Sequence, residues 1–122
     1  MKVKQIVFTK PCVAELLEKE MEAPKAGEVQ VRLAVSTISS GTERANLIGD
    51  PNVGPNSAGT VVFPRVLGYS SSGVVEAVGE GVTDFKIGDR VAMSWTTHAQ
   101  VLNVNRDCVY KLPDNVSFND GA

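Results

Sequence analysis

The stretch "VLGYSSSGVVEAVGEGVTDFKIGDRV", residues 66–91, contains the pattern that decides the fold. Two short β-rich runs, Gly73–Val78 and Arg90–Met93, lie on either side of the glycine pair Gly79 and Gly81. Glycine permits positive φ in tight connections. The segment therefore predicts two strands separated by glycine turns.

Similar β-rich runs occur along the rest of the chain, separated by Gly, Pro, Asn and Asp. In Glu28–Val35 apolar residues alternate with polar ones, which is the period of a half-buried strand. Glu15–Glu22 contains residues that favour a helix, but its short length and its neighbours favour a strand, and we interpret it as a strand. The spacing predicts an all-β sandwich or barrel. The remaining expected strands are Val3–Thr9, Ala99–Val104 and Val109–Leu112.

Two catalytic motifs are nearly present in residues 66–91 but fail on spacing. A nucleophile elbow needs Gly-x-Ser-x-Gly, and after Gly68 the next glycine is Gly73, one position too late. His98 is the sole histidine, and no carboxylate stands in a triad order relative to it. A dinucleotide fingerprint needs a third glycine where Asp84 stands, and no helical pattern follows.

Composition limits the partners and the compartment. The chain has 122 residues, enough for one domain, with 12 basic and 14 acidic side chains and no basic cluster. We expect neither nucleic acid nor a membrane as partner, and a cytoplasmic location. Cys12 and Cys108 are interpreted as small buried hydrophobic residues. With His98 they are too few and too far apart to predict a metal site.

Read as one block, GYSSSGVVEAVGEGVTDFKIGDRV resembles the "G-H-E-x-x-G-x-V-x-x-V-G-x-x-V-x-x-F-x-x-G-D-x-V" signature of the medium-chain dehydrogenase/reductase family, which contains zinc alcohol dehydrogenases and quinone oxidoreductases. The preceding APKAGEVQVRLAV resembles the family's "P-x-x-G-E-V-x-V-x-V" segment. The following HAQVLNVNRDCVYKLPDNVS resembles the stretch that ends the family's first domain. The resemblance covers nearly the whole chain.

The resemblance implies a mainly β fold, a GroES-like partly open β-barrel with a few short helices, over residues 1–122. In complete members this catalytic domain precedes a Rossmann domain that binds NAD or NADP, and the full-length protein would form a homodimer. We expect that nucleotide-binding domain to be missing by truncation and the domain to be inactive alone. Ser117 with Asp120 forms a helix start just before the chain stops.

The departures from the family pattern concern zinc. Zinc members carry Cys-x-Thr-Asp where this chain has Ser40-Gly41-Thr42-Glu43. They carry Gly-His-Glu where this chain has Gly68-Tyr69-Ser70. A serine hydroxyl is a poor zinc ligand compared with a thiolate, so the resemblance is to the zinc-independent branch, with no metal.

In that branch, a small carbonyl, alcohol or enone substrate is polarised by hydroxyl and backbone donors. The resemblance implies catalytic roles for Thr42, as relay hydroxyl, and for Tyr69, as donor to a developing oxyanion. Tyr69 could equally just fill the vacated metal pocket. Substrate contacts are expected from Ser40, Ser70 and Trp95, and cofactor contacts from Gly41 and Thr42.

Three further alternatives stay open at this point. Glu43 and Arg44 could form a local ion pair at the start of a short helix. The Gly-, Pro- and Asn-rich loop Gly49–Pro64 could cover the active-site cleft or be a surface insertion without a role. Finally, cochaperonins share the barrel and part of the glycine run, so a stand-alone GroES-like binding or assembly module is the alternative to an oxidoreductase domain.

Overall fold

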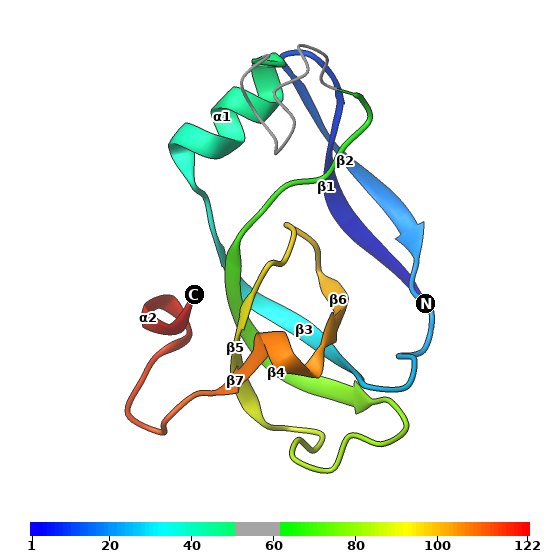
Figure 1. Cartoon of the computed structure of the whole chain (residues 1–122), viewed down its shortest axis with the longest axis vertical. Helices are drawn as coiled ribbons and strands as arrows, with labels where there is room; N and C mark the ends of the chain where they lie inside the picture. The colour runs from blue at the N-terminus through cyan, green and yellow to red at the C-terminus, as the bar shows by residue number, and fades with distance from the viewer. Residues whose placement is uncertain (51–61) are drawn as a thin grey trace.

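The computed structural model describes residues 1–50 and 62–122 and consists mainly of antiparallel strands. A five-stranded sheet has the order β6-β3-β4-β5-β7, and β1 pairs with β2 in a separate hairpin. Figure 1 shows helix α1 and the turn of the hairpin together at one end of the molecule, and the five-stranded sheet at the other. The strands are β1 (Lys2–Lys10), β2 (Val13–Glu20), β3 (Glu28–Thr37), β4 (Ser70–Val78), β5 (Arg90–Ser94), β6 (Val101–Asn105) and β7 (Val109–Lys111).

The core lies in the five-stranded sheet, around its central strands β3 and β4. Val29, Val31 and Val75 are at most 1% exposed. They pack with apolar residues of β5, β6 and β7. The alternation that predicted a strand in Glu28–Val35 is therefore confirmed, and so are the strands predicted on either side of the glycine turn.

The glycines of that turn meet two different demands. Gly81 has φ 83°, as a turn glycine should. Gly79 instead lies so close to Lys25 that an added Cβ would stand 1.8 Å from its carbonyl oxygen. The prediction that a glycine provides positive φ in this turn is thus correct for Gly81. At Gly79 glycine is required for another reason, because the backbone of Lys25 lies too close for a side chain.

The ambiguous segment Glu15–Glu22 belongs to strand β2 up to Glu20, which confirms the interpretation for all but its last two residues. β2 pairs along its length with β1, with Ile6 opposite Leu16. Its residues are nearly all exposed, so no buried face imposes an alternating pattern, and pairing with β1 overrides the helix propensity. The interpretation of Cys12 as buried is wrong: this residue lies exposed in the hairpin turn with φ 65°. Cys108 is half-buried against the core.

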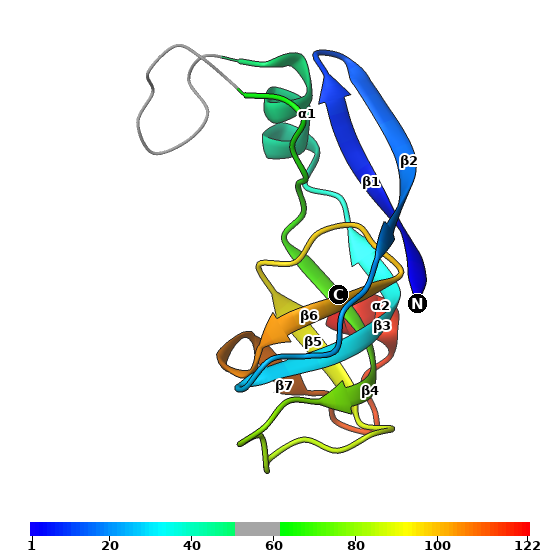
Figure 2. The ribbon, with the colours of Figure 1, turned by 90° about the vertical axis from the view of Figure 1, so that its right-hand side faces the viewer.

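The hairpin is joined to the rest of the barrel by backbone bridges of β1. Gln5 forms a bridge with Ala99, and Phe8 forms one with Arg65. The sheets do not close completely, which confirms the expected partly open barrel with few helices. In Figure 2 the hairpin stands beside α1 and crosses over the edge of the five-stranded sheet.

The chain's last described element is α2 (Phe118–Gly121), which begins where the sequence predicted. The Ser117 hydroxyl accepts a hydrogen bond from the Asp120 amide at 3.1 Å. The buried Ser72 hydroxyl donates to the carbonyl of Phe118 at 2.6 Å, which fixes α2 against β4. Among residues 1–50 and 62–122, no helix has the length and apolar character needed to cross a membrane.

Candidate functional site

Helix α1 (Ser40–Ile48) carries three of the predicted site residues on its first turn. It follows β3 after a short connection, and Ser39 is the N-cap. Successive helical residues turn by about 100°, so Thr42 lies about 200° around the axis from Ser40. Ser40, an expected substrate contact, and Thr42, the expected relay hydroxyl, therefore lie on nearly opposite sides of the helix axis. The Thr42 carbonyl accepts a hydrogen bond from the Asn46 side chain at 2.8 Å.

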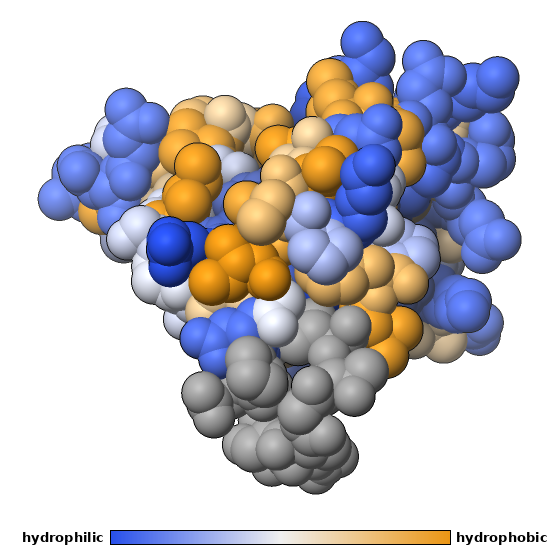
Figure 3. Space-filling model, turned by 90° about the horizontal axis from the view of Figure 1, so that it is seen from above, coloured by the Kyte–Doolittle hydropathy of each residue, from blue (hydrophilic) through white to orange (hydrophobic). Residues whose placement is uncertain are grey.

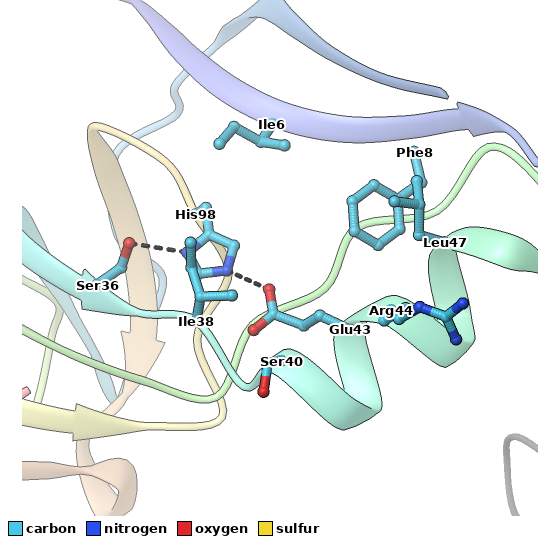
Figure 4. Close-up of a pocket in the computed structure, with 9 residues that line it drawn as sticks. All are labelled: Ile6, Phe8, Ser36, Ile38, Ser40, Glu43, Arg44, Leu47 and His98. Atoms are coloured by element: carbon cyan, nitrogen blue, oxygen red, sulfur yellow. Dashed lines mark hydrogen bonds and ion pairs between the residues drawn. The ribbon is translucent and has the colours of Figure 1, made fainter. Parts of the chain in front are cut away.

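Glu43 is turned inward from the same helix turn. It is 5% exposed, and its carboxylate accepts a hydrogen bond from the Ser39 amide and contacts Nε2 of His98. The other ring nitrogen of His98, Nδ1, lies 2.7 Å from the Ser36 hydroxyl (Figure 4). The alternative that Glu43 forms a local ion pair with Arg44 is therefore wrong, because the Glu43 carboxylate is bonded to Ser39 and His98 instead.

Sequence reasoning missed this contact between Glu43 and His98. The two residues are 55 positions apart, and no motif links them. A partial signal existed, since Ser-x-x-Glu at Ser40 and Glu43 resembles a capping box, in which the carboxylate reaches back to a backbone amide. It does so here, although the N-cap is Ser39. Ser36, His98 and Glu43 have the composition of a hydrolytic triad, but Ser36 lies within β3 and not on the exposed turn that presents a nucleophile.

Tyr69 and Trp95 form the second group of predicted residues. Their ring centroids are 5.8 Å apart, with the planes tilted by 51°. The Thr96 amide donates to the Tyr69 carbonyl at 3.1 Å, and the buried hydroxyls of Ser71 and Thr96 lie 2.7 Å apart. Trp95 is 76% exposed and has φ 59°, a backbone conformation that non-glycine residues adopt at a cost.

Gly68 allows this aromatic pair to form. It has φ 155°, and an added Cβ would lie 2.4 Å from the Thr96 carbonyl oxygen. Only glycine lets the segment before β4 approach the Trp95–Thr97 segment so closely. Because Tyr69 directly follows Gly68, this contact between the two segments places its ring beside that of Trp95.

The predicted residues thus fall into two groups, one on α1 and one beside β4 and β5. Within the described part of the chain, no hydrogen bond or ring contact joins Thr42 to Tyr69. Ser40 lines a cavity with Glu43 and His98, whereas Trp95 lines a different one near β6. Ser70 is the first residue of β4, next to Tyr69.

The donors in these positions do not suit zinc. Ser40 and Tyr69 offer neutral hydroxyls where thiolate and imidazole are the usual ligands. Both ring nitrogens of His98 already have protein partners, so its ring offers no free nitrogen to a metal. No group of three or more His, Cys, Asp or Glu suited to a metal ion occurs in residues 1–50 and 62–122.

The start of α1, in contrast, has open space beside Gly41. A Cβ added at Gly41 would meet nothing within 4 Å, so packing within the chain does not require glycine there. Glycine at such a place permits close approach of a group from outside. Gly41 and Thr42 are therefore compatible with a bound dinucleotide.

Comparison with known proteins identifies the family. Residues 25–117 match the family model of the alcohol dehydrogenase GroES-like domain. The chain belongs to this family. The GroES-like domain seen here is that of the medium-chain dehydrogenases and reductases, as its relatives show.

The GroES-like domain is similar to several oxidoreductases and to one vesicle protein. It is 31% identical over 112 residues to the human synaptic vesicle membrane protein VAT-1 homolog-like, covering 88% of this chain and 24% of that protein. It superimposes with a TM-score of 0.79 on the Pseudomonas syringae quinone oxidoreductase, at 31% identity, covering 98% of this chain and 36% of that one. The Escherichia coli quinone oxidoreductase, solved with NADPH, gives a TM-score of 0.74 at 26% identity, covering 97% and 36%. The chain thus spans between 24% and 36% of these relatives.

Proposed function

We propose that this chain is the substrate-binding, catalytic domain of a zinc-independent, NAD(P)-dependent oxidoreductase. The observation that carries the proposal is Tyr69, which stands where zinc members carry a histidine ligand. Its ring contacts that of Trp95, and the residue is 36% exposed, so the side chain is not enclosed by the rest of the chain. A phenol so placed can donate a hydrogen bond to an oxygen that gains negative charge.

The other predicted residues have supporting roles in this proposal. The Thr42 hydroxyl passes a proton between the substrate oxygen and solvent. Ser40, Ser70 and Trp95 contact the substrate, a small carbonyl, alcohol or enone compound. Gly41 and Thr42 contact the dinucleotide, which supplies a hydride when bound. The chain's own residues orient the substrate carbonyl and provide a proton to its oxygen.

The proposal includes a second domain outside these 122 residues. Because the chain spans at most 36% of the three relatives described above, we propose that a Rossmann domain follows it and binds the nucleotide. The domain alone is then inactive. A homodimer and a cytoplasmic location remain part of this proposal.

The experiment uses the complete protein encoded by the gene that contains this chain. Turnover of enones, quinones and aldehydes is measured with NADH and with NADPH, together with the zinc content of the purified protein. We expect turnover without stoichiometric zinc, and a clearly larger loss of turnover in Tyr69→Phe than in Trp95→Phe, which keeps an aromatic ring. Bound zinc, or a Tyr69→Phe variant with unchanged turnover, contradicts the proposed mechanism. Failure to bind either nucleotide favours the binding-module alternative.

A further inference from the structure

Helix α1 stands apart from β1 across a cavity of about 350 Å³. Ile6 and Phe8 line it from β1, Ile38 from the connection before the helix, and Leu47 from the helix itself (Figure 4). The helix residues that line it, at positions 40, 43, 44 and 47, belong to one face. Seen from above, apolar side chains gather on this end of the molecule between hydrophilic ones (Figure 3).

Two polar tethers hold the helix at this separation. At its first turn, Glu43 is bonded to His98, which in turn contacts Ser36 on β3. At its last turn, the Cys12 amide in the hairpin donates to the Leu47 carbonyl at 2.8 Å. These bonds fix both ends of α1 relative to β1 and the barrel, so the cavity is present in the chain without a guest.

The buried polar groups in the cavity wall, those of Glu43 and His98, already have partners. Each oxygen of the Glu43 carboxylate has one partner, and so does each ring nitrogen of His98. A guest in the cavity therefore meets mainly apolar side chains, and the polar groups left to it are the Ser40 hydroxyl and the exposed Arg44 side chain. A charged guest would lose much of its hydration, and an anion attracted by Arg44 would also lie near the Glu43 carboxylate.

We propose that this cavity is a binding site for a small uncharged molecule with a hydrocarbon body, such as a substituted benzene ring. An apolar cavity of about 150 Å³ is large enough to take benzene. The catalytic groups of the proposed function, Thr42 and Tyr69, do not line this cavity, and of the proposed substrate contacts only Ser40 does. The inference concerns a second ligand and does not require the proposed oxidoreductase activity.

Toluene is the probe for the test. It is titrated into the 122-residue chain carrying ¹³C-labelled methyl groups, and methyl shifts are followed by NMR. We expect saturable shifts at Ile6, Ile38 and Leu47 and none at Val104, which lies in the barrel core. Absence of saturation within toluene's aqueous solubility, or shifts spread evenly over the core methyls, overturns the proposal.

A matched pair of variants on α1 locates the site. Leu47→Trp fills the cavity and should weaken toluene binding by about tenfold or more. Ile48→Trp makes the same change at the next position, which does not line the cavity, and should leave binding unchanged. Equal effects of the two variants contradict the assignment. If Leu47→Trp does not fold, Ile38→Trp, at a residue 71% exposed on the cavity rim, replaces it with the same expectation.

Benzoate tests the charge preference, because it has the same ring with an added carboxylate. We expect it to bind at least about tenfold more weakly than toluene. Arg44, exposed at the rim, is the cation that would attract it. Tighter binding of benzoate than of toluene, lost in Arg44→Gln, would show an anion site and reject the uncharged ligand class.

Discussion

Substituting Glu43 by alanine should lower the free energy of unfolding by about 2–6 kcal/mol. The carboxylate accepts from the Ser39 amide and contacts His98, and the side chains of His98 and Glu43 are only 9% and 7% exposed. The substitution leaves two donors without acceptors, and an unsatisfied buried donor costs about 1–3 kcal/mol. Two such penalties together give the expected loss.

Urea denaturation of the 122-residue chain measures this loss. Glu43→Gln keeps an acceptor for the Ser39 amide and can still bond the His98 ring, so it should cost only about 1 kcal/mol. Glu76→Ala is the matched control, because this glutamate pairs with Arg32 at the surface, with side chains 28% and 51% exposed. It should cost no more than about 1 kcal/mol. A Glu43→Ala variant as stable as Glu76→Ala would refute the reasoning.

The protonation of His98 provides an independent criterion. His98 is the single histidine of the chain, so ¹⁵N-histidine labelling gives one pair of ring signals. Because a carboxylate can only accept, we expect the proton on Nε2, which faces Glu43. In Glu43→Gln the amide should donate to that nitrogen, and the ring proton should move to Nδ1. A ring with no proton on Nε2 in the unsubstituted chain would contradict the contact.

Two glycine positions and one turn residue give the remaining predictions. Gly68→Ala should lower stability by about 2–4 kcal/mol, since its Cβ would lie 2.4 Å from a carbonyl oxygen at φ 155°. In the same thermal unfolding experiment Gly41→Ala should raise stability by roughly 0.5–1 kcal/mol, because its Cβ meets nothing and alanine favours the helix; the same sign for both substitutions would contradict this. Cys12→Gly should raise stability by roughly 0.5–1 kcal/mol by relieving the cost of φ 65° at an exposed turn; a lower melting temperature would show that the cysteine side chain contributes to the turn.

The strands were predictable because burial leaves a periodic trace in the sequence. Alternation in Glu28–Val35 corresponds to Val29 and Val31 at the core. The strand in Glu15–Glu22 was harder to predict, because a strand exposed on both faces shows no alternation and because glutamate and leucine also favour a helix. Pairing with β1 makes this segment a strand, and the local sequence does not show that pairing.

The candidate site was predictable only in part. The pairing of Tyr69 with Trp95 brings together two predicted residues, although their roles remain predictions. The contact of Glu43 with His98 depends on how the fold brings α1 to the segment between β5 and β6. Nothing local to either residue indicates it, and the nearer cation, Arg44, was the natural but wrong partner. The exposed Cys12 was missed because turn geometry, and not hydrophobicity, determines its place.

The attachment of β1 to the barrel bears on the order in which the protein folds. The hairpin β1–β2 is local in sequence and can form within microseconds. Its place on the barrel is different, because Lys4 bonds Gln100, 96 positions away, and Ile6 bonds the carbonyl of His98. Closing so long a loop costs entropy that only the completed sheet can offset. Although it comes earliest in this domain, β1 must therefore wait for nearly all of the domain to be synthesised before it docks.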